Sequence, residues 1–136
     1  MVNNYIIIYY IIKNMTQYTV YLQKSTNTKK KYMVTLVKPD TKNKTIHFGA
    51  NGYSDYTKHK DSDRMKRYNS RHKTRENWTK SGITTAGFWS KWILWSKPSL
   101  KNAIDYTSTK FNIKIIRRSP PKRKSPKRKS KSKRVK

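Results

Sequence analysis

Uncompensated positive charge limits how much of this chain can fold. Of its 136 residues, 34 are lysine or arginine and only 6 are acidic, which gives a formal net charge of +28, while 33% are hydrophobic. Charges of one sign oppose compaction, and a core spanning the whole chain would need more apolar residues. We therefore expect one small domain with appendages. The sequence has no cysteine, so packing must stabilise this domain without disulfides or thiolate metal sites.

The C-terminal segment is the most unbalanced part of the chain. Residues 117–136 hold 12 lysines and arginines, no acid, no aromatic residue and a single valine. Ordering this segment would gather charge without burying apolar surface, so we predict a disordered basic tail. Proline precedes a basic run twice, in 119–124 and in 125–129. This pattern resembles the Ser-Pro-basic repeats of linker-histone and protamine tails, which bind DNA. A tail that only confers solubility is the alternative.

The N-terminus carries an apolar run from Tyr5 to Ile12. It is too short to span a bilayer, which takes about 20 residues, and it lacks the basic start and cleavage site of a signal peptide. Isoleucine and tyrosine favour a strand. We assign residues 1–15 to an apolar N-terminal extension outside the domain. Alternatively, translation starts at Met15, and residues 1–14 are then not part of the protein. Neither interpretation predicts a membrane function.

Alternating apolar and polar residues predict three strands in the first half of the domain. They cover 18–23, 32–37 and 45–48, and polar turn sequences separate them. Sequential strands with short connections favour antiparallel pairing. We expect a small three-stranded antiparallel β-meander.

Helical patterns follow the strands. The first predicted helix begins at Asp61–Asp63, where acidic residues can cap free amides, and runs to about Trp78. The second covers Ala86 to Trp95, and a third starts after Pro98 and carries apolar residues on one side. The predicted fold class is therefore α+β over residues 16–116, with the β-meander followed by two or three α-helices and the basic tail over 117–136.

Arginines recur on one face of the first predicted helix, at i, i+3, i+7 and i+11 from Arg64. Residues 16–116 hold 21 lysines and arginines against 6 acids, so attraction to a polyanion should survive loss of the tail. An ordinary solvated helix face is the alternative. The predicted nucleic-acid-binding residues are Arg64, Arg67, Arg71, Arg75, Arg117, Arg118, Lys122, Arg123, Lys124, Lys127, Arg128, Lys129, Lys131, Lys133 and Arg134.

Four tryptophans lie close together in the sequence, at Trp78, Trp89, Trp92 and Trp95. Such rings can stack on unpaired bases, as in proteins that bind single strands. Aromatic residues at helical spacing more often form the core, and few other residues could fill this domain. We favour the core interpretation.

Histidines and acids could also be interpreted as a metal site. A hairpin followed by a helix with Asn69 and His72 is loosely similar to the ββα-metal nucleases, but the paired histidines and tight spacing of that family are missing. Asp61 and Asp63 are better explained as helix caps. We therefore expect no enzyme activity, no metal and no cofactor. The residues of this alternative are His47, His59, Asp61, Asp63, His72 and Glu76.

Several segments together resemble one family. They are 46–61, 67–68, 71–73, 76–78 and the aromatic stretch 85–100. They are similar to small basic proteins of unknown function encoded by giant DNA viruses, the mimivirus and phycodnavirus-like group, over roughly residues 31–111. The resemblance implies a viral origin, which agrees with the abundance of residues with A/T-rich codons, but it implies no activity.

These observations together predict sequence-independent binding of nucleic acid, viral DNA in the first place, during genome packaging or in the virion core. The expected location is the virion, or the host nucleus or viral factory. A structural virion protein that docks to an acidic capsid or core protein is the alternative. We expect neither a membrane nor a small-molecule substrate as a partner.

Overall fold

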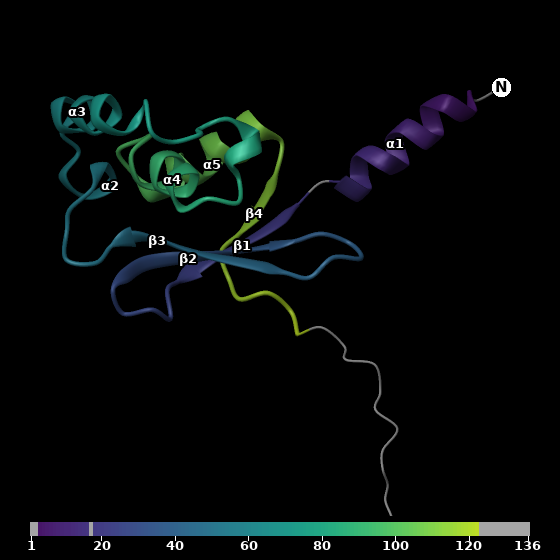
Figure 1. Ribbon diagram of the computed structural model, residues 1–136, viewed down its shortest axis with the longest axis horizontal. Coiled ribbons are helices and arrows are strands. Elements are labelled where there is room, and N and C mark those ends of the chain that lie inside the picture. Colours follow the sequence, from purple (N-terminus) through teal and green to yellow (C-terminus); the bar gives the residue numbers. More distant parts are fainter. Residues whose placement is uncertain (1–2, 17, 123–136) are drawn as a thin grey trace, which may run out of the picture.

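A four-stranded sheet organises the domain in the computed structural model, which describes residues 3–16 and 18–122 (Figure 1). The predicted meander is confirmed, with β1 (Thr19–Lys24), β2 (Lys30–Val37) and β3 (Lys44–Ala50) pairing antiparallel. A fourth strand, β4 (Lys114–Ile116), was not predicted. It pairs parallel to β1, so the strand order is β3-β2-β1-β4.

The two faces of the sheet differ in what covers them. Val20 and Leu22 of β1 lie opposite Leu36 and Val34 of β2, and all four side chains are buried in the main hydrophobic cluster. Figure 1 shows helices α2 to α5 on this side of the sheet. The alternate positions point to the other side, which we call the open face. Tyr21 lies there, because successive side chains of a strand alternate.

The predicted helical half is confirmed as a set of short helices. Four of them begin at side-chain caps, where Asp55, Asp61, Thr85 and Ser99 accept hydrogen bonds from backbone amides. The last helix buries one side against the cluster, as its apolar spacing predicts. The helices are α2 (Tyr56–His59), α3 (Ser62–His72), the 3₁₀ turn η1 (Lys80–Gly82), α4 (Ala86–Trp89), the π-helix η2 (Ser90–Leu94) and α5 (Leu100–Phe111).

Aromatic residues form the centre of the core. Phe48 of β3 and Phe88 and Trp89 of α4 are completely buried. The ring of Phe88 packs on that of Phe111 of α5, with 4.9 Å between the ring centres. Trp89 donates its indole N–H to the carbonyl of Ile83 at 2.7 Å, which satisfies its only polar side-chain atom. The core therefore joins the sheet to α4 and α5.

The N-terminal strand prediction is wrong, because residues Asn4–Thr16 form helix α1. The carbonyl and side-chain oxygens of Asn3 accept backbone amides from the first turn. The side chains of residues 5–10 are exposed. A lone strand would leave its backbone groups unpaired, whereas a helix pairs them internally. Within the described residues, every helix is too short or too polar to cross a membrane.

Candidate nucleic-acid interface

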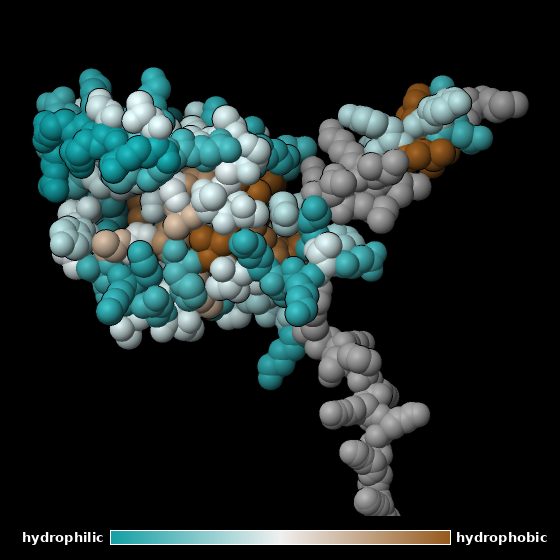
Figure 2. Space-filling model, in the orientation of Figure 1, coloured by the Kyte–Doolittle hydropathy of each residue, from teal (hydrophilic) through white to brown (hydrophobic). Residues whose placement is uncertain are grey.

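Helix α3 presents the cations that the sequence singled out. Asp61 caps its start and accepts hydrogen bonds from the amides of Asp63 at 3.0 Å and Arg64 at 3.3 Å. These bonds lower the pKa of Asp61, so its carboxylate stays charged beside the positive end of the helix dipole. The prediction that Asp61 is a cap is confirmed. Figure 2 shows hydrophilic side chains gathered over α3.

Three of the four predicted stripe arginines lie on this helix. Arg64, Arg67 and Arg71 are exposed, and a rotation of 100° per residue places them within one narrow sector. The predicted position of Arg75 is wrong, because α3 ends at His72. Arg75 follows in a turn, where its guanidinium donates to the carbonyl of Arg71. The stripe therefore contains three arginines.

Contacts made by residues beyond α3 explain why the helix ends earlier than predicted. The Glu76 carboxylate is bonded to Nδ1 of His72 at 2.8 Å and accepts the indole N–H of Trp78 at 2.9 Å, which folds the chain back on the helix. Gly87 lies beneath this carboxylate. A Cβ on Gly87 would stand 2.8 Å from Glu76 Cδ, so a larger residue there would displace the carboxylate from its present position.

Stacked rings fix α3 to the rest of the domain. Tyr68 is buried, and its ring lies between those of Trp95 and His72, with ring centres 4.2 Å and 4.1 Å apart. Burial, followed by the charge of Glu76, raises the pKa of Tyr68 well above its usual value, while an interaction with the Ser90 hydroxyl opposes this shift. The phenol is therefore neutral and can donate a hydrogen bond. Because Tyr68 holds α3 against the domain, the backbone positions from which Arg64 and Arg71 extend are fixed.

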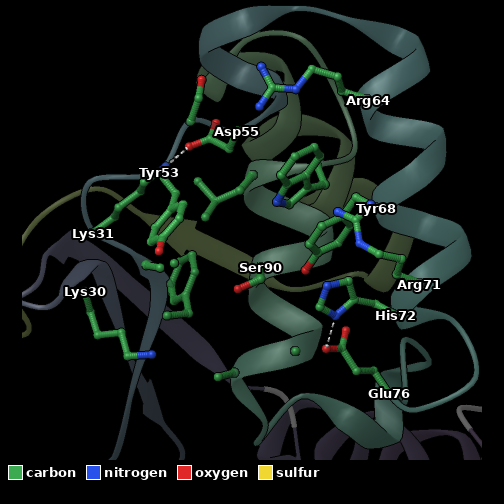
Figure 3. A pocket seen from close by; sticks show the side chains of 18 residues that line it. Lys30, Lys31, Tyr53, Asp55, Arg64, Tyr68, Arg71, His72, Glu76 and Ser90 are labelled. Atoms are coloured by element: carbon green, nitrogen blue, oxygen red, sulfur yellow. Dashed lines mark hydrogen bonds and ion pairs between the residues drawn. The ribbon is translucent and has the colours of Figure 1, made fainter.

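A cleft of about 520 Å³ opens between α3, the end of β3 and α4–η2 (Figure 3). Arg64, Tyr68 and Arg71 line it from α3. Tyr53 and Lys30 face them from the sheet side, and Ser90 lies between the two walls. Lys30, Tyr53 and Ser90 were not singled out in the sequence. They come from segments far apart in the chain, and no local pattern marks them.

Both carboxylates that line the cleft already interact with other groups of the protein. Asp55 is 1% exposed and forms an ion pair with Lys31, and it also accepts the backbone amide of Thr57. Glu76 is held by His72 and Trp78 as described above. Among the side chains of residues 3–10 and 18–122, the only lysines or arginines in ion pairs are Lys31 and Lys101. Arg64, Arg71 and Lys30 therefore surround the cleft as uncompensated cations.

The core interpretation of the tryptophans is confirmed for Trp89, which is completely buried. Trp92 and Trp95 pack against the same core but remain partly exposed. The predicted helix Ala86–Trp95 changes from α to π geometry at Ser90, and this change shifts which side chains point inward. Ile93 and Leu94 are buried in place of Trp92 and Trp95.

Lysines lie over the partly exposed rings on another part of the surface. The ammonium of Lys91 is 4.8 Å from the ring centre of Trp78 and 5.1 Å from that of Trp92, and it donates to Asn69 at 3.0 Å. Lys110 lies 5.2 Å from the Trp92 ring centre. Burial and the charge of Lys110 lower the pKa of Lys91. These cations already interact with aromatic rings, which leaves them less available to a ligand than those of the cleft.

The start of the basic tail contacts the open face of the sheet. The guanidinium of Arg118 lies 5.3 Å from the ring centre of Tyr21, and Ser119 donates to Gln23 at 2.9 Å. Arg117 and Lys122 are exposed. The first residues of the predicted disordered tail are thus held against β1. The remaining predicted binding residues, Arg123, Lys124, Lys127, Arg128, Lys129, Lys131, Lys133 and Arg134, lie outside the described residues.

The side chains of the alternative metal site have other partners or positions. Nδ1 of His47 interacts with the Ser25 hydroxyl at 2.7 Å, and Nδ1 of His59 accepts the backbone amide of Asp61 at 2.9 Å. Asp61 caps α3. Across the part of the chain that the structure describes, no three histidine or acidic side chains gather in a metal-binding group.

Fold and surface together define a small basic α+β domain with an arginine-bearing helix beside a cation-lined cleft. Residues 20–72 match the model of a family of unknown function (DUF5754), and the match includes β1 apart from Thr19, together with β2, β3, α2 and α3. It stops before the aromatic stretch 85–100 that carried part of the sequence resemblance, and nothing in it links the family to giant viruses. Neither the curated proteins nor the solved structures contain a match.

Proposed function

We propose that this protein binds nucleic acid through its phosphates, without reading the base sequence. The observation that carries the proposal is the set of three exposed arginines, Arg64, Arg67 and Arg71, on one sector of a capped and anchored helix. A guanidinium can hold a phosphate with two parallel hydrogen bonds, and each neutralised phosphate releases counterions.

Sequence independence follows from the kind of contact. Contacts to phosphate position a protein on nucleic acid but carry no base information. The tail would add further cations, beginning with Arg117 and with Arg118, which lies over Tyr21 on the open face. We further propose that the natural target is viral DNA, bound during packaging or in the virion core. This narrower statement rests on the sequence resemblance and on the tail composition.

A salt titration with a matched pair of variants tests the proposal. Binding of the full chain to single-stranded DNA, duplex DNA and RNA is measured by fluorescence anisotropy between about 50 and 200 mM salt, where phosphate-mediated binding weakens steeply. The double variant Arg64→Gln/Arg71→Gln is compared with Lys66→Gln/Lys73→Gln. Both variants remove two exposed cations seven residues apart from the same region, and helical spacing places the two pairs on opposite sides.

The arginine variant should bind more weakly and with a flatter salt dependence than the lysine variant. Deletion of residues 117–136 should reduce the binding without abolishing it. Equal reductions in the two double variants would show that total charge, and not the α3 surface, is responsible. If the full chain binds neither DNA nor RNA in near-physiological salt, the proposal fails, and docking to an acidic virion protein becomes the better explanation of the charge.

A further inference from the structure

The cleft beside α3 has features that a surface for phosphates alone does not need. A backbone-binding surface requires only exposed cations. This cleft also has depth, exposed aromatic surface and hydroxyl groups. Its volume of about 520 Å³ is within the range of small-ligand pockets, roughly 300–1,000 Å³.

The charges of the cleft favour an anion. Its two carboxylates, Asp55 and Glu76, are held by Lys31 and by His72 with Trp78. Arg64, Arg71 and Lys30 line the same space and form no ion pair within the described residues. An incoming anion therefore meets cations on both walls, with every nearby carboxylate already engaged.

The rings of the cleft have different roles. Both faces of the Tyr68 ring are covered, by Trp95 and by His72, so this ring cannot accept another flat group. Tyr53 is 74% exposed at the opposite wall, and its ring is available for stacking (Figure 3). Between these two tyrosines, Ser90 presents a hydroxyl (Figure 3). Phe48 and Leu94 also line the cleft, but their side chains are almost completely buried, so Tyr53 supplies the exposed apolar surface.

We propose that this cleft binds a single nucleotide, with its phosphate against Arg64 and Arg71 and its base against Tyr53. The hydroxyls of Ser90 and Tyr68 would meet the polar edge of the base or the sugar. A nucleotide carries a flat base with a polar edge at one end and a phosphate at the other, with the sugar between them. This order of groups matches the cleft, where Tyr53 and the arginines lie on opposite walls. The inference rests on the proposed function and deepens it, because it names a single nucleotide as the part of a nucleic acid that the cleft would bind.

The nucleotide can come from a free mononucleotide or from a strand. In a duplex the base is paired and stacked, and extruding it is unfavourable because both interactions are lost. The cleft should therefore favour single strands or strand ends over an intact duplex. The arginines outside the cleft would bind both forms equally.

The test uses the full chain and three small probes: adenosine 5′-monophosphate, adenosine and inorganic phosphate. Binding is measured by calorimetry, and competition by the mononucleotide against a labelled single-stranded oligonucleotide and its duplex is measured by anisotropy. The monophosphate should bind at least about tenfold more tightly than either fragment, because both halves of the cleft contribute. It should displace the single strand more readily than the duplex.

Variants separate the cleft from the charge around it. Arg71→Gln should weaken binding of the monophosphate about tenfold, whereas Arg67→Gln, which removes the same charge from the same helix outside the cleft, should change it less than about twofold. Tyr53→Leu should also weaken binding of the monophosphate, whereas Tyr53→Phe, which keeps the aromatic ring, should bind the monophosphate about as tightly as the unchanged protein. Circular dichroism checks that each variant folds.

The outcomes distinguish the two proposals. If inorganic phosphate binds as tightly as the monophosphate, or if Arg67→Gln and Arg71→Gln have equal effects, the nucleotide site is refuted while phosphate-mediated binding stands. If the monophosphate binds as expected but no strand of DNA or RNA does, the site holds free nucleotide and the proposed function is refuted.

Discussion

The helix-covered side of the sheet and its open face both present arginines, but they hold them differently. On the covered side, Arg64 and Arg71 extend from a helix that is fixed by Tyr68 between two other rings. On the open face, Arg118 rests on the ring of Tyr21, next to a short strand. The first arrangement fixes cations around a shaped space, whereas the second mainly adds charge. We therefore expect binding to depend on the positions of the arginines on the covered side, and mainly on the number of cations on the open face.

The largest expected effect comes from the buried acid behind the cleft. Asp55→Ala would leave the buried ammonium of Lys31 without its partner and remove the cap of α2, and breaking a buried pair costs about 3–5 kcal/mol. Asp105→Ala removes the exposed partner of Lys101 and should cost less than about 1 kcal/mol. Urea denaturation measures both. Similar costs in the two variants would mean that the cleft is not held by this pair.

The next prediction compares how the two faces use their charge. Replacing Arg64, Arg67 and Arg71 with glutamine should lower the salt slope of duplex binding by about 0.9 for each phosphate that is no longer neutralised, and so should Arg117→Gln/Arg118→Gln. Only the first variant should also lose preference for single strands, because only it alters the cleft. An unchanged slope in both variants would exclude these cations from the interface.

A third prediction compares two tyrosines with the same burial. Tyr68 and Tyr21 are each 8% exposed, but Tyr68 stacks on two rings and Tyr21 contacts a guanidinium. Tyr68→Leu should therefore cost about 1–2 kcal/mol more than Tyr21→Leu, since stacked rings add stability beyond their buried area. Thermal unfolding followed by circular dichroism would show the difference. Equal costs would argue that stacking does not anchor α3.

The smallest expected effect concerns acidification at the start of α3. Burial, followed by the charge of Arg64, lowers the pKa of His59 from its ordinary value of 6.5, and its Nδ1 accepts the amide of Asp61. The folded state thus disfavours the protonated ring. Stability should fall as the pH drops through 6.5 and stop falling below the lowered pKa. His59→Gln should flatten this part of the pH profile in denaturation experiments, and an unchanged profile would contradict the assignment.

Local patterns predicted most of the fold and part of the candidate site. Alternation identified β1 to β3, and the cap at Asp61 located the start of α3. The strand β4 was missed because three residues carry too little periodicity and their pairing depends on β1. Similarly, the end of α3 depends on the contacts that Glu76 makes beyond the helix.

The arginines and the cleft illustrate the same limit. Helical spacing alone grouped Arg64, Arg67 and Arg71. It could not show that Arg64 and Arg71 meet Lys30 and Tyr53 across a cleft, because these residues come together only when α3 docks on the core. Asp55 was missed for a related reason, since it caps α2 and its partner Lys31 lies 24 residues earlier, on β2.

The late position of β4 in the chain has a consequence for synthesis. Until residues 114–116 emerge from the ribosome, β1 can pair with β2 on one edge, but the hydrogen-bonding groups of its other edge lack the partner that β4 later provides. Contacts between such distant segments form slowly. A nascent chain released before Lys114 would therefore expose an unpaired strand edge. We expect such truncated products to aggregate, whereas the full-length protein should not.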